Sequence, residues 1–486
     1  MLFNSLDFSI FLPIVFLLYW FVAQKNLKLQ NALIVLASYV FYGWWDWRFL
    51  SLIIFSTVVD YLVGQKLRNK EKQSKRKVFL WTSIIVNLGF LGFFKYYNFF
   101  LENFVDAFSL FGMEINSNSL NIILPVGVSF YTFQTLSYTI DVYNRKLEPT
   151  KDFIAFSAFV CFFPQLVAGP IERATNLLPQ FYKKRIFEYH KAVDGMRQIL
   201  WGLFKKVVIA DNCAEFANQI FNNSSDMNGS TLVLGAIFFT FQIYGDFSGY
   251  SDIAIGTSRL FGFNLKQNFS TPYFSRDIAE FWRRWHISLS TWFRDYLYIP
   301  LGGSRGGTWM KVRNTFSIFL VSGFWHGANW TFIIWGALNA IYFLPLLLTD
   351  NNRKNLGVVA EGKLLPSFRE LFAMLSTFTL TAFAWIFFRS ESVSHAFSYI
   401  KEIFSKSIFN IPNGSDFIGT EIHPFTMFTL IGIFLIIEWL GRGGEVAITQ
   451  LSIKWKASWR HTIYYAIIIA LFWFSGKEQE FIYFQF

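Results

Sequence analysis

The sequence predicts an all-α integral membrane protein that crosses the bilayer many times. Of its 486 residues, 53% are hydrophobic, 21% are aromatic and only 15% are charged, whereas charged residues make up about 25% of a typical soluble domain. Apolar stretches near the roughly 20 residues that a transmembrane helix needs recur along the whole chain. We therefore expect a single membrane domain over residues 1–486, with about eleven transmembrane helices and additional re-entrant and interfacial helices.

The basic residues are expected to set the topology of these spans and not to bind nucleic acid. They gather in short loops between apolar segments and give a net charge of +11. With the N-terminus outside, the stretch 65–77, which has seven Lys or Arg and one acid, lies on the cytoplasmic side, and 102–120 lies outside. The expected spans are 8–23, 31–45, 48–64, 78–94, 121–140, 230–250, 312–326, 329–348, 369–388, 424–440 and 461–475.

Two further segments are expected to enter the membrane without crossing it, and 193–212 is ambiguous. Segment 153–169 breaks the alternation of sides and is interrupted by Pro164, so we expect it to dip in and return. Non-helical backbone at membrane depth occurs only inside protein or beside water, which favours an internal chamber. Segment 281–297, FWRRWHISLSTWFRDYL, gathers its aromatic residues on one arc of a helical wheel and its arginines elsewhere. This pattern is typical of a helix that lies in the interface.

His326 stands out among the six histidines because it lies deep in an apolar segment, within SGFWHGANW at 322–330. Gly323 and Gly327 would let another backbone or a substrate approach closely. A buried histidine bonded to a neighbouring helix would fit this pattern. A neutral imidazole in a low-dielectric site could instead take a proton from a hydroxyl, as a general base does. The remaining histidines, apart from His286, lie in polar loops or at the starts of spans: His190, His395, His423 and His461.

Several other kinds of site are not indicated. His286 and His326 are 40 residues apart and show neither HxxxH nor HExxH spacing, so no metal site is expected. A Walker motif does not occur. The glycines of GDFSGYSDIAIG, 245–256, are expected to pack helices beside Asp246 and Asp252, which would line a cavity.

Five longer stretches carry a resemblance to a known family. They are LPVGVSFYTFQTLSYTIDVY (124–143), FFPQLVAGPIER (162–173), YGDFSGYSDIAIG (244–256), NFSTPYFSRDIAEFWRRWHISLSTWFRDYLYIPLGG (268–303) and SGFWHGANWTFIIWGALNA (322–340). The ending EFIYFQF carries the same resemblance. On these residues the sequence resembles the membrane-bound O-acyltransferases, and among them the bacterial branch typified by the membrane subunit of alginate O-acetylation. The likeness covers nearly the whole chain.

The resemblance implies transfer of an acyl group, usually acetyl, across the cytoplasmic membrane onto a hydroxyl of an envelope polysaccharide. His326 would be the catalytic histidine and His286 the second signature position. A ring of helices would surround a thinned centre with a funnel from each face. No bound cofactor is expected, because the donor would be a cytoplasmic acyl thioester, acetyl-CoA. A periplasmic or extracytoplasmic acetyltransferase is the expected protein partner.

The other expected site residues would serve the same reaction. A group of arginines would attract the phosphates of the donor: Arg283, Arg284, Arg294 and Arg305. Asp295 is a further expected substrate-binding position. His286, Asn329 or the indole N–H of a tryptophan such as Trp325 would stabilise the oxyanion.

Two alternatives stay open. Within the family, the chain could transfer D-alanine to teichoic acid from a carrier-protein thioester, although the ending and the length favour acetylation. From a different class, a transporter or flippase would also show broken spans and charges within the membrane. No inverted repeat is visible in the sequence, which disfavours a transporter.

Overall fold

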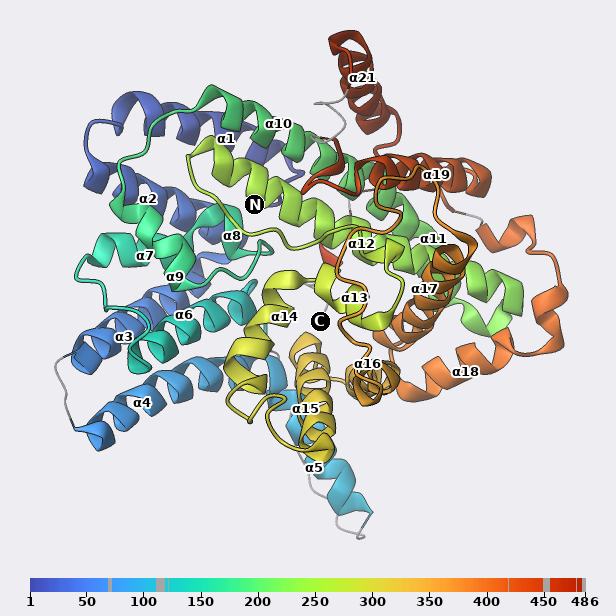
Figure 1. The fold of residues 1–486 in the computed structure, drawn as a ribbon, viewed down its shortest axis with the longest axis horizontal. Helices are drawn as coiled ribbons and strands as arrows, with labels where there is room; N and C mark the ends of the chain where they lie inside the picture. Colours follow the sequence, from blue (N-terminus) through green and yellow to red (C-terminus); the bar gives the residue numbers. More distant parts are fainter. Residues whose placement is uncertain are drawn as a thin grey trace. The chain divides into compact units, whose positions relative to one another are not determined.

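The computed structural model describes residues 1–68, 72–110, 119–120, 122–417, 419–448, 455–477 and 479–482, and every regular element in these ranges is a helix (Figure 1). The all-α prediction is therefore confirmed for these residues. Residues 69–71 of the expected basic loop and 111–118 of the expected outer stretch lie outside them. The chain forms two compact units, Met1–Ala192 with Thr257–Lys266 (unit 1) and Val193–Gly256 with Gln267–Phe486 (unit 2). The single domain over 1–486 stays a prediction.

Within the described residues, six helical stretches are long and apolar enough to cross a membrane: Leu27–Arg68, Gln73–Ser109, Gly229–Leu260, Trp330–Leu348, Phe368–Arg389 and Pro424–Gly441. Shorter apolar helices occupy Leu6–Val22 and Phe153–Leu166. The count of eleven spans is not confirmed. The expected span 121–140, for example, becomes helical only at Val128, because Pro125 and Gly127, whose φ is 72°, form a turn before it.

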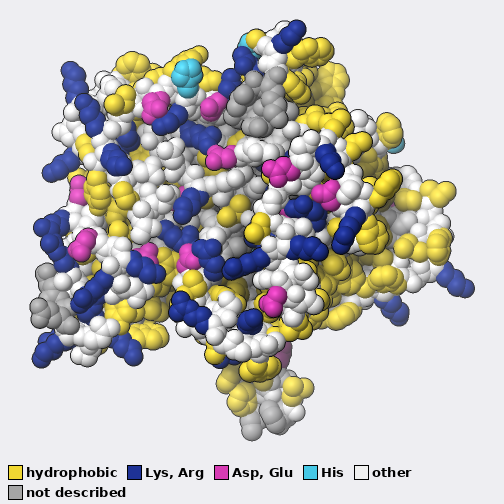
Figure 2. All heavy atoms as spheres, in the orientation of Figure 1, with side chains coloured by type: hydrophobic (Ala, Val, Ile, Leu, Met, Phe, Trp, Pro, Cys, Tyr) yellow, Lys and Arg dark blue, Asp and Glu magenta, His cyan; other side chains and the backbone are white. Residues whose placement is uncertain are grey.

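Unit 1 is a bundle of helices. The helices α3, α4 and α6 pack against one another, and α2 packs against α7 and α8. Figure 2 shows Lys and Arg side chains along the side of unit 1 that α2, α3 and α4 occupy in Figure 1. The bounds are α1 (Leu6–Leu17), α2 (Leu27–Asp46), α3 (Leu50–Arg68), α4 (Gln73–Leu91), α5 (Tyr97–Ser109), α6 (Val128–Tyr143), α7 (Phe153–Cys161), α8 (Phe163–Leu166) and α9 (Ala174–Leu177).

The expected re-entrant segment 153–169 is a broken helical element. Its first helix, α7, has nine residues and is about 14 Å long, less than half of the hydrocarbon thickness of about 30 Å. The chain leaves the helical region at Phe162, whose ψ is 104°, and Pro164 lies in the first turn of α8. Both helices are buried, so the break lies inside protein, where backbone groups can be satisfied. Its return to the same side of the membrane stays a prediction.

Unit 2 contains the two conspicuous histidines. The ambiguous segment 193–212 belongs to one helical run, in which a π-helical stretch, Phe204–Ala210, joins α10 to α11. The helices are most of α10 (Tyr189–Leu203), α11 (Asp211–Asn222), most of α12 (Gly229–Leu260), α13 (Ile278–Arg284), α14 (Ile287–Phe293), α15 (Thr308–His326), α16 (Trp330–Leu348), α17 (Phe368–Arg389), α18 (Val393–Ile403), α19 (Pro424–Gly441) and α21 (Ala457–Trp473).

Close glycine contacts join α12 to α10, as the sequence predicted. A Cβ atom on Gly249 would lie 2.7 Å from the Gly202 carbonyl oxygen, and one on Gly202 would lie 2.6 Å from the Gly249 carbonyl oxygen. The two helices therefore touch through their backbones. Asp252 binds Lys205 at 2.5 Å and Asp246 binds Lys206 at 2.8 Å, and the cavity expected beside these aspartates stays a prediction.

Lys206 is the centre of a buried ionic cluster. Its Nζ lies 2.7 Å from Asp211 Oδ1 and 2.8 Å from Asp246 Oδ1, and it donates to the Gln479 carbonyl at 3.0 Å. The three charged side chains are at most 5% exposed. Lys205 and Lys206 both lie in the π-helical stretch. Helix distortions of this type often mark functional regions.

Replacing Lys206 by methionine keeps the length of the side chain but removes the cation from Asp211 and Asp246. Loss of one partner from a buried ion pair costs about 3–5 kcal/mol, so we expect a lower thermal midpoint for the purified protein in detergent. Lys191→Met is the matched control, because Lys191 pairs with Glu188 at the surface with side chains 49% and 56% exposed. Equal midpoints for Lys206→Met and wild type would contradict a stabilising role for the cluster.

Candidate active site

The segment that carries His286 is bent. The helix α13 ends at Arg284, α14 begins at Ile287, and His286 between them has a φ of 43° and a ψ of 54°. A non-glycine residue in this left-handed region is uncommon and often marks a functional site. The prediction of one continuous helix over 281–297 is therefore wrong, whereas its interfacial location stays a prediction. Its aromatic arc is buried by other parts of unit 2: Trp285 is 1% exposed and contacts Trp385.

The tautomer of His286 follows from its neighbours. Its Nδ1 lies 3.1 Å from Asn268 Oδ1, which also accepts the backbone N–H of Ser288 at 3.2 Å. The second contact requires an oxygen at that position, so His286 Nδ1 carries the proton and donates it. The lone pair is then on Nε2. Burial lowers the pKa of His286, which lies outside the six candidate spans, to about 3, so its ring is neutral at pH 7.

His326 ends α15 inside a group of aromatic rings. Its ring centroid lies 4.8 Å from that of Trp325, 5.2 Å from Trp335 and 5.3 Å from Phe388, and its side chain is buried. The Trp325 ring also contacts His286, with centroids 6.2 Å apart. One indole therefore touches both predicted catalytic histidines. Such a water-excluding environment strengthens electrostatic interactions with a reacting group.

Glycines make this arrangement possible. A Cβ atom on Gly323 would overlap the backbone carbonyl of Phe332, and one on Gly336 would overlap the backbone carbonyl of Phe319. A Cβ on Gly327 would overlap the Phe332 ring. The helices α15 and α16 therefore meet backbone to backbone, as expected from glycines 323 and 327.

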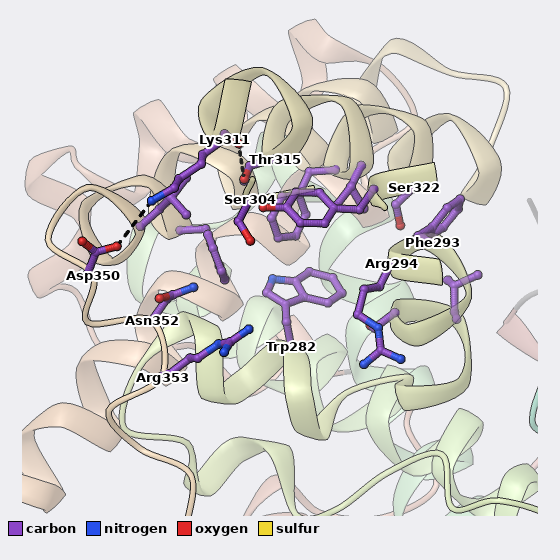
Figure 3. Close-up of a pocket in the computed structure, with 17 residues that line it drawn as sticks. Trp282, Phe293, Arg294, Ser304, Lys311, Thr315, Ser322, Asp350, Asn352 and Arg353 are labelled. Atoms are coloured by element: carbon purple, nitrogen blue, oxygen red, sulfur yellow. Dashed lines mark hydrogen bonds and ion pairs between the residues drawn. The ribbon is translucent and has the colours of Figure 1, made fainter. Parts of the chain in front are cut away.

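A cavity of about 570 Å³ lies in unit 2 (Figure 3), within the range of about 300–1,000 Å³ for small-molecule sites. Neither His286 nor His326 is among its lining residues. Ser322 and Leu289 line it, and they lie one helical turn from His326 and His286 respectively. Apolar lining residues include Trp282, Leu289, Phe293, Ile318, Phe319, Phe343 and Leu347; the charged ones are Arg294, Lys311, Arg353 and Asp350. Figure 3 shows the Trp282 indole between Arg353 and Arg294. The cavity is thus largely apolar with cationic groups at its edge.

Arg283 and Arg284 form hydrogen bonds with a loop that lines this cavity. Arg283 donates to the carbonyls of Asn352 and Asn355 at 2.7 and 2.8 Å, and Arg284 donates to the carbonyl of Gly357 at 3.2 Å. The same loop supplies cavity-lining residues at positions 350, 352 and 353. Neither arginine is itself part of the lining.

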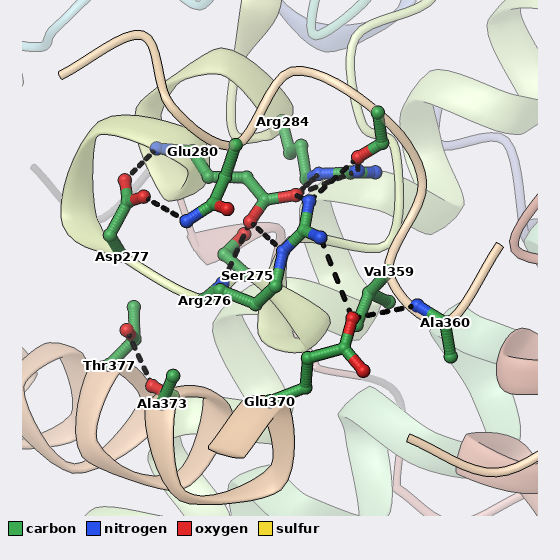
Figure 4. Close-up of polar contacts among 12 residues, drawn as sticks. Ser275, Arg276, Asp277, Glu280, Arg284, Val359, Ala360, Glu370, Ala373 and Thr377 are labelled. Carbon is green, nitrogen blue, oxygen red and sulfur yellow. Dashed lines mark hydrogen bonds and ion pairs between the residues drawn. The ribbon is translucent and has the colours of Figure 1, made fainter. Parts of the chain in front are cut away.

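A buried carboxylate holds the arginines in place. Glu280 binds Arg276 at 3.0 Å and Arg284 at 2.9 Å, and Arg276 reaches Glu370 of α17 at 3.7 Å (Figure 4). Arg276 also donates to the Gly357 carbonyl at 2.8 Å. These contacts join α13, α17 and the loop that follows α16.

The other predicted site residues lie at different places, and only some of them line the cavity. Arg294 lines the cavity and binds Asp295 at 2.8 Å, with the arginine side chain 58% exposed. Asn329 caps α16, accepting the Thr331 N–H at 3.0 Å and donating to a backbone carbonyl at 2.9 Å. These contacts use Oδ1 and one of the two amide N–H groups of Asn329, and its oxyanion role stays a prediction. Arg305 is exposed and is not a lining residue.

The reasoning from sequence did not identify the residues that support His286. Phe247 of α12 packs edge-on against the His286 ring at 4.5 Å, and Phe481 packs against Phe247 at 5.9 Å. The backbone N–H of Ile482 donates to Asp246 at 2.7 Å. Segment 479–482 is therefore anchored to the helix that supports His286. The only available signals were the motif that begins at Asn268 and the ending of the chain, both of which carried the resemblance.

Asn268 is expected to act as a positioning residue for His286. Asn268→Leu removes the acceptor for the Nδ1 proton, so we expect kcat to fall by about tenfold or more while KM for the acyl donor stays near wild type. Asn268→Asp keeps an acceptor and places a negative charge beside the ring, which should raise the pKa of His286 and shift the pH–rate profile. Unchanged kcat in Asn268→Leu, or unchanged pH profiles in both variants, would contradict this role.

Comparisons with known proteins indicate the family of this chain. The model of the membrane-bound O-acyltransferase family, MBOAT, matches residues 147–375, a range that contains His286 and His326. The probable alginate O-acetylase AlgI of Pseudomonas aeruginosa is 38% identical over 91% of this chain and 81% of its own length. The peptidoglycan O-acetyltransferase of Helicobacter pylori is 32% identical over 100% of this chain and 98% of its own. The teichoic acid D-alanyltransferase of Bacillus subtilis is 27% identical over 57% of this chain and 71% of its own.

The identities extend over most of the chain, well beyond the range that the family model matches. The apolar helices agree with a multi-pass membrane protein. Together these observations show an acyltransferase, and the chain belongs to the membrane-bound O-acyltransferase family.

Proposed function

We propose that this protein moves an acetyl group from a cytoplasmic thioester to a hydroxyl of an envelope polysaccharide or of peptidoglycan, in the cytoplasmic membrane. The observation that carries the proposal is the position of His326. It lies in a water-excluding aromatic group, contacts the same indole as His286, and is one helical turn from a lining residue of the cavity.

The names of the relatives support a glycan acceptor. Alginate and peptidoglycan are glycans, and the two relatives named for their O-acetylation match nearly this whole chain. D-Alanyl transfer to teichoic acid is the second candidate, and the relatives with that name cover only 57% and 50% of this chain. Acetyl is therefore the favoured acyl group.

The composition of the cavity supports acetyl-CoA as the donor. Arg294, Lys311 and Arg353 at its edge suit phosphate groups, and the only acidic residue in the lining, Asp350, is paired with Lys311 at 3.7 Å. The aromatic and aliphatic lining suits an uncharged thioester arm. Arg283 and Arg284 contribute by holding the loop that carries Arg353.

In the proposed reaction His326 takes the proton of the acceptor hydroxyl, and the resulting alkoxide attacks the thioester carbonyl. A C–O bond forms, the C–S bond breaks, and the departing thiolate receives the proton from His326. In the tautomer described above His286 Nε2 can accept a proton but not donate one, so the Trp325 indole N–H is the better candidate for stabilising the oxyanion.

The acetyl group can also be transferred in two stages, in which a nucleophile on a protein partner accepts it first. An extracytoplasmic acetyltransferase would then carry the acetyl group to the polymer. The same His326 chemistry applies, because the partner would also present a nucleophile to the thioester.

The test is NMR of envelope glycans from a deletion strain complemented with wild type, His326→Ala, His286→Ala or His461→Ala, at matched protein levels. His461 is exposed and is the control. We expect O-acetyl signals with wild type and His461→Ala, and a decrease of about a hundredfold or more with His326→Ala. Full acetylation with His326→Ala would reject the catalytic role. Loss of D-alanyl esters in place of acetyl esters would favour the second candidate, and normal esters of both kinds in the deletion strain would reject the proposed function.

A further inference from the structure

Ser322 contributes a buried hydroxyl to the cavity in unit 2. The side chain lines this cavity and is only 5% exposed, and its hydroxyl has no hydrogen-bond partner among the described residues. Figure 3 shows it pointing from α15 into the cavity. A buried hydroxyl without a partner is unfavourable. A ligand that places a hydrogen-bond acceptor at this point would therefore be stabilised there.

The neighbouring hydroxyl groups, in contrast, are bound to the backbone. Serine and threonine within a helix commonly donate to the carbonyl four residues earlier. Thr315 and Ser317 of α15 both do so, at 2.9 Å, and Ser290 of α14, which also lines the cavity, donates to a backbone carbonyl at 3.3 Å. Ser322 makes no such bond, so its proton is available to a group in the cavity.

Ser322 belongs to a stripe of α15 that lines the cavity and leads toward His326. The stripe recurs at helical spacing and consists of Lys311, Thr315, Ile318, Phe319 and Ser322. Trp325 and His326 follow three and four residues after Ser322, so they continue the same face. At a rise of 1.5 Å per residue, Ser322 is about 6 Å from His326 and about 16 Å from Lys311 along the helix axis. A ligand that is anionic at one end and carries its reacting carbonyl at the other fits this order.

The side chains beside Ser322 in the stripe are apolar. The Phe319 ring, one turn earlier, lies 5.3 Å from Trp282 and 5.9 Å from Phe343, measured between ring centroids. Such a surrounding has a low dielectric constant, in which a hydrogen bond is stronger than in water. A single hydroxyl can therefore hold an uncharged carbonyl group in place here.

We propose that the Ser322 hydroxyl donates a hydrogen bond to the carbonyl oxygen of the acyl thioester and is a catalytic residue for the transfer. This inference rests on the proposed function. The bond holds the carbonyl near the alkoxide that His326 generates, and it strengthens as the carbonyl oxygen becomes an oxyanion. The C–O bond forms, the C–S bond breaks, and the thiolate takes its proton from His326, while Ser322 keeps its own proton. The Trp325 indole N–H would be the second donor to the same oxygen.

A nucleophilic role for Ser322 is the competing explanation. A serine nucleophile needs a base that accepts its proton, and such pairs are recognised by a hydrogen bond between the two side chains. Ser322 has no such bond to any described residue. The geometry therefore favours a hydrogen-bond donor over a covalent acyl-serine.

The kinetic test uses the purified full-length protein in detergent with acetyl-CoA and a soluble glycan fragment. Ser322→Ala removes only the hydroxyl, so we expect kcat to fall by about 100-fold. The affinity for CoA, which has no acetyl carbonyl, should stay at the wild-type value. Ser322→Thr keeps a hydroxyl and should retain most of the activity. The control is Ser317→Ala, on the same helix but outside the cavity lining, and it should behave like wild type.

An infrared measurement tests the same bond without turnover. Acetyl-CoA labelled with ¹³C at the carbonyl is bound in the absence of acceptor, and the carbonyl band is recorded. A hydrogen bond lowers the stretching frequency of a carbonyl, so the band should lie lower in wild type and Ser322→Thr than in Ser322→Ala. Ser322→Cys, a weaker donor of similar size, should give an intermediate band, and it replaces Ser322→Ala if that variant fails to fold.

Each contrary result has a distinct meaning. Wild-type kcat and an unshifted band in Ser322→Ala would overturn the inference and leave the proposed function intact. An acetyl group found on Ser322 by mass spectrometry after treatment with acetyl-CoA would also overturn it, because the hydroxyl would then be the nucleophile. If wild type itself transfers no acetyl group from acetyl-CoA, the proposed function fails and the inference fails with it.

Discussion

The position of His326 depends on the contact between the backbones of α15 and α16. Side chains larger than hydrogen at positions 323 and 336 would overlap the carbonyls of the opposite helix, so any other residue would separate the two helices. Their close approach brings Trp335 of α16 against the imidazole, and Phe388 of α17 closes the same group of rings. A histidine in a membrane segment is costly unless protein surrounds it. The glycines therefore create the enclosed aromatic environment of the His326 imidazole.

His286 is held in place by a different set of residues from those around His326. Asn268 determines its tautomer, and Phe247 of α12 supports its ring. The helix α12 is in turn held by its glycine contact with α10 and by the ion pair of Asp246 with Lys206. Segment 479–482 binds the same aspartate through a backbone N–H. Charged residues that never approach the substrate can thus influence the geometry of the site through packing.

How much was predictable from sequence differs among these features. The helical class and the membrane setting followed from apolar lengths, and the family followed from long motifs. The catalytic role of His326 stays a prediction. The break at His286 did not follow from the sequence, because a helical wheel assumes regular dihedral angles and cannot show a single left-handed residue. Arg283 was expected at the substrate, but its partners are loop carbonyls about 70 residues away, which no local pattern encodes. The N-cap role of Asn329 could have been predicted, since an asparagine directly before an apolar helix is a common N-cap.

The central claim is that His326 performs the proton transfer and does not bind the donor. The most direct measurement compares acetyl-CoA binding with acetyl transfer to envelope glycan fragments, in one purified preparation each of wild type and His326→Ala. The account predicts that the variant binds acetyl-CoA with wild-type affinity and transfers no acetyl group above background. Transfer at the wild-type rate would contradict it. Loss of binding in a correctly folded variant would also contradict it, because His326 would then act in donor recognition.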